Sequence, residues 1–172
     1  MIIYTNANPV LSAQDLCDSD ILTKTEFAFH ILLTVLKDAG CPEHRLPNTR
    51  PKHYRLNTIS FNWAKRTRNN FIWTLEWGLA LCREFKLRFG KSHPLEPHYI
   101  EIDANSLRRY VKRGKLSVPP KDFNEEFLTQ EMKKDMVGWS GEEANRRYYM
   151  LIEPHFVMKW NCGREKPDWW TV

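Results

Sequence analysis

The sequence contains no long run of apolar residues, because its apolar stretches end after a few positions. A membrane-spanning helix needs ~20 consecutive apolar residues, so we expect no contact with a membrane. The segment from Met1 to Asn6 also lacks the basic region and the small-residue cleavage site of a secretory leader. These absences predict a protein of the cytoplasm.

Closely spaced cysteines are absent as well. The four cysteines, Cys17, Cys41, Cys82 and Cys162, include no Cys-x-x-Cys pair. Disulfide frameworks are typical of small secreted domains, and structural zinc sites use close ligand pairs, so we expect free thiols. The histidines are scattered along the chain, and none of their spacings to Asp or Glu predicts a metal site. We therefore expect no metal and no cofactor.

What the sequence does contain is a small basic excess and many tryptophans. The chain has 172 residues, the size of one domain, and we expect residues 1–172 to form a single domain. It carries 26 Lys and Arg against 21 Asp and Glu, a net charge of +5, together with 7 Trp. These counts suit a ligand that bears both phosphate and a base. They also fit a tryptophan-rich core beneath a basic surface.

Helical periodicity predicts a mostly α fold, a single compact helical domain around one long central helix. The long helix is expected at 62–89, ending at Gly90, and shorter helices at 24–37, 104–112, 123–136, 140–152 and 154–160. Ser140 and Glu143 have the spacing of a helix capping box. Residues 2–4 are expected to form a short strand, and 41–57, with three prolines, a basic loop.

At about 100° per residue, the segment 62–89 separates into two faces. One face is apolar and is expected to pack on the core: Ala64, Phe71, Leu75, Gly78, Leu79, Cys82, Phe85 and Phe89. The other face mixes aromatic, polar and charged side chains: Trp63, Arg66, Asn70, Trp73, Trp77, Glu84 and Arg88. Buried charges need partners, so we interpret this mixed face as the wall of a ligand cleft. The alternative is a second packing face with a Glu84–Arg88 ion pair at i,i+4 spacing.

The cleft interpretation gives each candidate side chain a role in binding a nucleotide. The expected phosphate ligands are Arg66, Arg88, Lys91 and Arg146. Bases would stack on Trp73 and Tyr149, and Asn70 would read a base edge. Trp63 and Lys159 complete the expected lining.

Two further features extend this interpretation. If the protein cleaves its ligand, His93 and Glu84 are the expected acid–base pair, since both can transfer a proton near neutral pH when their environment tunes them. The adjacent Trp169 and Trp170 are expected to fasten the C-terminal tail to the domain, because termini stay mobile unless they are tied down.

A series of short motifs spans nearly the whole chain. In order they are Asn8-Pro9-Val10, Ala13-Gln14, Trp63-Ala64, Asn70, Trp73, Leu79-Ala80-Leu81-Cys82, Glu84, Arg88, Gly90-Lys91, His93, Arg146, Tyr148-Tyr149, Lys159-Trp160, Arg164-Glu165, Pro167 and Trp169. This order resembles a family of small phage proteins commonly labelled pyrimidine dimer DNA glycosylase, or endonuclease V-like. The resemblance implies phage origin, the host cytoplasm as location, and damaged pyrimidines in DNA as substrate. The chain differs from the family in its first helix, where it has Asp18-Ser19-Asp20 and family members have a motif similar to Asp-Lys-His.

Together these features favour a protein that binds, and in one version cleaves, a phosphorylated nucleotide. A cyclic nucleotide that signals infection in the host has this chemistry, and binding it would give an anti-defence role. The alternative partner is DNA, on which the protein would act as a glycosylase or lyase. We rank DNA second because a net charge of +5 is low for a protein that binds a duplex. A non-enzymatic protein-interaction module is the third alternative. A homodimer and a monomer are both compatible with the sequence.

Overall fold

The computed structural model describes residues 1–49, 58–121, 123–152 and 158–171. Within these residues the fold is helical, as the sequence predicted, and its elements follow one another without a strand. The α-helices are α1 (Pro9–Gln14), α2 (Asp18–Asp38), α3 (Ile59–Arg66), α4 (Arg68–Phe89), α5 (Glu96–Ala104), α6 (Gln130–Asp135) and α7 (Gly141–Leu151). Short 3-10 turns lie at Glu43–Arg45, Leu107–Tyr110 and Glu125–Phe127.

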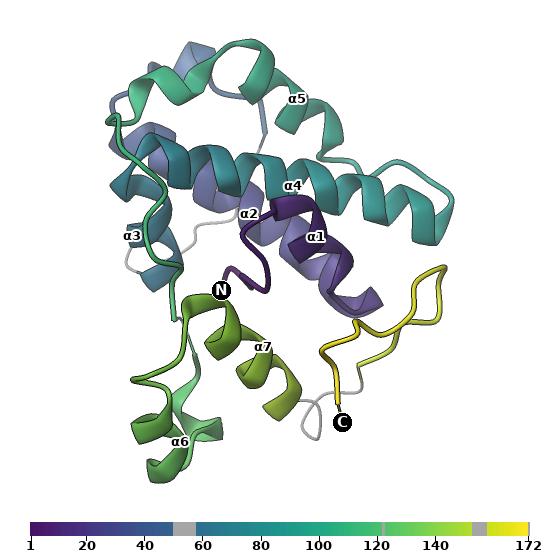
Figure 1. Ribbon diagram of the computed structural model, residues 1–172. Helices are drawn as coiled ribbons and strands as arrows, with labels where there is room; N and C mark the ends of the chain where they lie inside the picture. Colours follow the sequence, from purple (N-terminus) through teal and green to yellow (C-terminus); the bar gives the residue numbers. More distant parts are fainter. Residues whose placement is uncertain (50–57, 122, 153–157, 172) are drawn as a thin grey trace.

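Helix α4 is the central element, and α6 lies farther from it than the other helices do (Figure 1). Figure 1 shows α5 on one side of α4, and α7 with the C-terminal segment on the other side. Helices α1, α2 and α3 also pack against α4. The largest fully buried side chains include Trp77 and Phe71 from α4, Phe29 from α2 and Tyr99 from α5. The core therefore lies around α4 along most of its length.

The predicted helix at 62–89 is interrupted, so the expectation of one continuous helix was wrong. Thr67 adopts an extended conformation, with φ −144° and ψ 156°, and separates α3 from α4. The Thr67 hydroxyl accepts a hydrogen bond from Asn70 N, and Thr58 caps α3 in the same way. Threonine favours this role because its side-chain oxygen satisfies an unpaired amide at a helix start. Gly90, with φ 70°, ends α4 as predicted.

The predicted strand at residues 2–4 is also not formed in the structure. These residues are buried, and the amide groups of Ile2 and Tyr4 pair with side chains and not with a second strand. Ile2 N donates to Ser60 Oγ over 2.8 Å, and Tyr4 N donates to Asn145 Oδ1 over 3.3 Å. The hydrogen-bond partners of this segment therefore come from α3 and α7.

The other predicted helices agree with the structure to different degrees. Helix α2 contains the predicted segment 24–37 and begins six residues earlier, at Asp18, and α7 begins after its Ser140 cap as predicted. Segment 104–112 forms a 3-10 turn after α5 and not an α-helix, and 123–136 is helical only over its two short pieces. The expected helix at 154–160 falls mostly outside the described residues, and 158–160 is not helical. The basic loop at 41–57 lies outside them from residue 50 onward.

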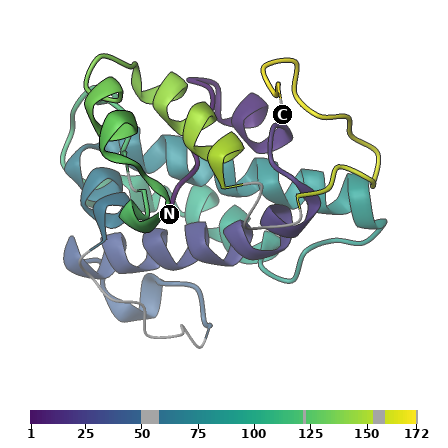
Figure 2. The same cartoon turned by 90° about the horizontal axis from the view of Figure 1, so that it is seen from below.

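The C-terminal segment is fastened to the domain, as its tryptophans predicted. Trp160 Nε1 donates to Asp15 O over 3.2 Å, and Trp169 Nε1 donates to the Asp15 carboxylate over 3.1 Å. Burial raises the pKa of Asp15, and hydrogen bonds to its carboxylate from Thr5 and Trp169 counteract that effect. Seen from below in Figure 2, the segment, in yellow, lies at the same edge of the molecule as α1.

Gly78 allows α4 and α5 to approach closely, and this contact gives a test of the core. A Cβ atom at Gly78 would overlap the ring of the fully buried Tyr99. We expect Gly78→Ala to lower the free energy of unfolding by about 2–3 kcal/mol, measured by urea denaturation. Gly138→Ala is the control, since its added Cβ would have Asp135 O at 3.8 Å and no closer neighbour. Equal midpoints for the two variants would contradict this packing.

Candidate functional site

The mixed face of α4 is covered by other parts of the chain. Trp73, 3% exposed, stacks on Tyr4 with ring centroids 4.4 Å apart, and its Nε1 donates to Ala7 O over 2.8 Å. Trp63 meets the edge of the Trp73 ring, at a centroid distance of 5.7 Å. Trp77 is fully buried and stacks on Trp73 at a centroid distance of 5.8 Å. The rings of Tyr4 and Trp77 therefore stack on Trp73, where a base was expected to stack.

Arg88 and Glu84 form the ion pair that the alternative interpretation predicted, at 3.2 Å. The buried Arg88 guanidinium also donates to the carbonyl oxygens of Gln14 and Leu16 and to the Asp18 carboxylate. Glu84 is held from its other side by Arg164, which approaches both carboxylate oxygens at 2.9 and 2.6 Å. The expected phosphate ligand and the expected acid–base group therefore already have protein partners.

Two expected ligands on α7 are engaged in the same manner. The Tyr149 hydroxyl donates to Asp20 over 2.6 Å and accepts from Cys17 N over 3.0 Å. Its complete burial, with Asp20 beside it, raises the Tyr149 pKa well above its usual value. Arg146 Nε donates to Thr5 O over 2.7 Å, and its guanidinium lies over the Trp169 ring. These contacts fix α7 to the N-terminal and C-terminal segments.

His93 and Glu84 contact different partners, so the structure does not bring the expected acid–base pair together. His93 is buried against the Phe85 ring at a centroid distance of 4.8 Å, and its Nδ1 accepts from Leu95 N. Burial lowers the His93 pKa, opposed by the charges of Glu26 and Glu96. Lys91 and Lys159 are exposed.

Arg66 is exposed at the end of α3, and it lies beside a group of cations that sequence reasoning missed. The chain that follows α5 is hydrogen-bonded to the α3–α4 junction. Arg68 N donates to Lys112 O over 2.7 Å, and the Thr67 hydroxyl donates to Lys115 O over 3.0 Å. The Arg68 side chain adds hydrogen bonds to the carbonyl oxygens of Arg109 and Val111.

Two expected base-contacting residues hold the next part of this chain in place. The Asn70 amide donates to Trp63 O and to Ser117 Oγ, at 2.8 and 2.7 Å, and accepts from Ser117 N at 2.9 Å. Trp63 Nε1 donates to Val118 O over 2.7 Å. Asn70 and Trp63 therefore position residues 117–118, and every polar atom of the Asn70 amide is used.

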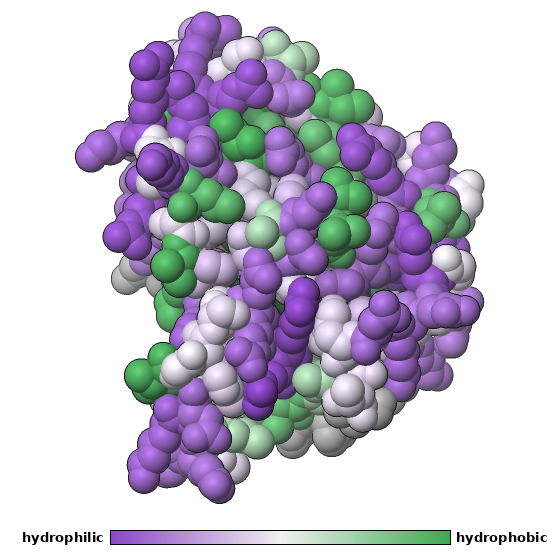
Figure 3. Space-filling view, viewed as in Figure 1, coloured by the Kyte–Doolittle hydropathy of each residue, from purple (hydrophilic) through white to green (hydrophobic). Residues whose placement is uncertain are grey.

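We call the exposed cations at this junction the basic connector surface: Arg66, Arg109, Lys112, Arg113 and Lys115. None of them forms an ion pair with a described carboxylate, whereas the flanking Arg108 and Lys65 pair with Asp103 and Asp38. Figure 3 shows hydrophilic residues gathered over this corner of the molecule, at its upper left. The signal in the sequence was the run 108–115, which has five Lys and Arg and no Asp or Glu.

Comparison with known proteins gives no relative for this chain. Searches of protein-family models, of curated proteins and of solved structures found no match. No described helix combines the length and the apolar character that a membrane span requires. Among the described residues, His, Cys, Asp and Glu do not gather into a group able to hold a metal ion.

The hydrogen bonds of Asn70 can be tested against those of its neighbour. We expect Asn70→Ala to lower the free energy of unfolding by about 2–3 kcal/mol, because it leaves buried polar partners unsatisfied. Amide hydrogen exchange at Ser117 should accelerate in the same variant. Asn69→Ala is the matched control, since Asn69 is exposed and one position away. Unchanged exchange at Ser117 would contradict this role of Asn70.

The lowered His93 pKa predicts how stability depends on pH. The unfolded chain, in which histidine titrates near 6.5, binds this proton more readily than the folded protein does. The contribution of neutral His93 to the free energy of unfolding is therefore complete above pH ~6.5 and decreases as the pH falls below this value. We expect His93→Asn to reduce this acid-induced loss, measured by urea denaturation at about pH 7.5 and 5.5. An identical loss in both proteins would rule out His93 as its source.

Proposed function

We propose that the protein binds the phosphate backbone of a nucleic acid through the basic connector surface. The observation that carries this proposal is the group of exposed cations without described carboxylate partners, on a chain segment fixed by hydrogen bonds to α3 and α4. Phosphate neutralisation by Lys and Arg supplies most of the affinity of sequence-independent nucleic-acid binding. The proposal keeps the phosphate chemistry expected from the sequence and moves it from a cleft to an open surface.

The rigidity of the connector supports this function. Cations on a mobile loop lose conformational freedom when they bind, whereas cations on a fixed backbone lose less. The bonds from Thr67, Arg68 and Asn70 hold the connector at both ends of its basic part. Arg109 and Arg113 add the forked donors that suit phosphate oxygens.

A buried nucleotide pocket on the mixed face of α4 is less well supported than the open surface. Arg88, Asn70 and Tyr149 would each have to exchange internal hydrogen bonds for bonds to a ligand. Leaving such partners unsatisfied is costly in a buried site. The separate surroundings of His93 and Glu84 give no geometric support to cleavage, so we propose binding without catalysis.

The proposal predicts which positive charges are needed for binding. We expect the quadruple change Arg109→Gln, Lys112→Gln, Arg113→Gln and Lys115→Gln to weaken binding to a labelled DNA duplex at least about tenfold, measured by fluorescence anisotropy at low salt. The dependence of log K on log salt should flatten by about 3–4, since each phosphate contact contributes ~0.9 to the slope.

The matched control removes four charges from other exposed positions: Lys37→Gln, Arg83→Gln, Lys86→Gln and Lys134→Gln. Both variants change the net charge from +5 to 5 − 4 = +1, so only the location differs. The control should bind like the wild type. An equal loss of affinity in both variants would mean that the net charge, and not the basic connector surface, determines binding. A wild-type protein that binds neither duplex nor single-stranded DNA would exclude the proposal.

A further inference from the structure

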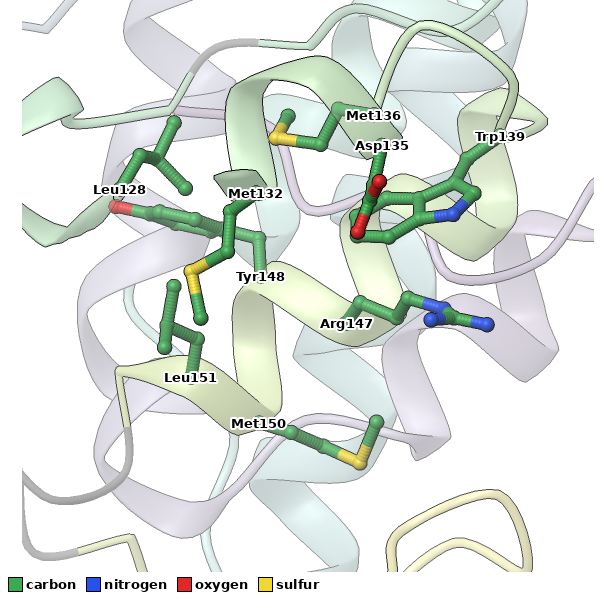
Figure 4. Close-up of a pocket in the computed structure, with 9 residues that line it drawn as sticks. All are labelled: Leu128, Met132, Asp135, Met136, Trp139, Arg147, Tyr148, Met150 and Leu151. Atoms are coloured by element: carbon green, nitrogen blue, oxygen red, sulfur yellow. The ribbon is translucent and has the colours of Figure 1, made fainter. Parts of the chain in front are cut away.

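Helices α6 and α7 and the segments next to α6 line a partly open cavity of about 480 Å³ that lies apart from the basic connector surface. Its lining combines apolar residues with a few polar ones: Leu128, Met132, Asp135, Met136, Trp139, Arg147, Tyr148, Met150 and Leu151 (Figure 4). This volume falls within the range of small-molecule sites in proteins. Three of the five methionines of the chain contribute to the lining.

The protein itself fills this space poorly. Helix α6 has six residues and none of them is buried, and Met132 in this helix and Met136 directly after it are both partly exposed. On the opposite wall, Tyr148 is buried and stacks on Phe123 at a centroid distance of 4.4 Å. Protein interiors normally pack to the density of organic crystals, so an apolar cavity of this size offers burial to a ligand.

The two ends of the cavity differ in character. Figure 4 shows Leu128, Met132, Tyr148 and Leu151 at one end, and Asp135, Trp139 and Arg147 at the other. The Arg147 guanidinium lies 4.5 Å from the centre of the Trp139 ring and pairs with Glu143 at 2.7 Å. That pair is exposed and contributes little to stability, so a ligand anion can replace Glu143. Asp135 forms no ion pair with a described residue.

We propose that this cavity binds a single amphiphile with a linear apolar chain and a zwitterionic head group. The chain occupies the apolar end beside Met132, and the flexible thioethers of Met136 and Met150, elsewhere in the lining, let the cavity adapt to the ligand. The head group lies at the polar end, with its positive charge beside Asp135 and its negative charge beside Arg147. Opposite charges on the two side chains disfavour a head group that carries one sign alone.

Methionine methyl signals provide a direct test. The protein, labelled at its methionine methyl carbons, is titrated with decylphosphocholine below the concentration at which micelles form. We expect saturable shifts of the Met132, Met136 and Met150 signals, with a dissociation constant on the order of 0.1 mM. The signals of Met1 and the buried Met158 lie outside the cavity lining and should not move.

Variants separate the cavity from the rest of the surface. The double change Leu128→Gln and Met132→Gln should weaken binding at least about tenfold. Leu87→Gln is the control, because Leu87 is an exposed apolar residue of α4. An unchanged Met158 signal and thermal midpoint in the double variant will show that it remains folded.

Two further probes test the head group. Decanoate and decyltrimethylammonium carry the same chain with a single negative or positive charge, and each should bind about fivefold more weakly than the zwitterion. Asp135→Asn should remove the disadvantage of decanoate, and Arg147→Gln that of the cation. Tighter binding of either singly charged probe to the wild type would overturn the head-group assignment.

Other outcomes of the titrations would contradict binding of a single amphiphile in the cavity. Absence of shifts with all three probes, or equal shifts of all five methionines, would overturn the site. Sedimentation with phosphatidylcholine vesicles that is lost in the double variant would replace the single amphiphile by a membrane surface as the partner. None of these results depends on nucleic-acid binding, which uses different residues.

Discussion

The buried guanidinium of Arg88 is the interaction on which the arrangement of several segments depends. It donates to the carbonyl oxygens of Gln14 and Leu16 and pairs with Asp18 and Glu84. A buried charge without partners costs several kcal/mol, so the end of α1 and the start of α2 must meet α4 at this point. Arg164 then pairs with Glu84 and brings the C-terminal segment to the same place. One charged side chain thereby constrains parts of the chain that are far apart in sequence.

Buried polar groups must also find partners at the other end of α4, and there this need determines the position of an exposed surface. Asn70 is fully buried, and its amide can be satisfied there only by bonds to Trp63 and Ser117. Together with the bonds from Arg68 N to Lys112 O and from the Thr67 hydroxyl to Lys115 O, they hold the connector after α5 against the α3–α4 junction. A polar residue in the core thus determines where charges lie on the outside, although it contacts no ligand itself.

The sequence allowed the helical fold, the Gly90 and Ser140 helix boundaries and the fastening of the tail to be predicted, because each depends on local pattern or on burial. It did not allow the function of the mixed face to be decided. A ligand cleft and a second packing face need the same mixture of Trp, Asn, Glu and Arg, and only the positions of distant segments, which cover this face in the structure, distinguish them. The break at Thr67 was missed for a related reason, since the apolar period continues across it while the cap depends on one hydroxyl.

The two proposed sites place opposite demands on the fold, and the structure meets each in a different region. Electrostatic binding gains most from cations held at fixed positions, and the connector is bonded to α3 and α4 through Thr67, Arg68 and Asn70. Apolar binding gains from side chains that adapt, and Met132 of α6 and Met136 directly after it are partly exposed beside a helix without buried residues. A ligand that fills the cavity adds the packing that α6 lacks, so it should stabilise α6 and α7 against local opening more than it stabilises α4. Binding at the connector has little packing left to add, because its backbone is already fixed.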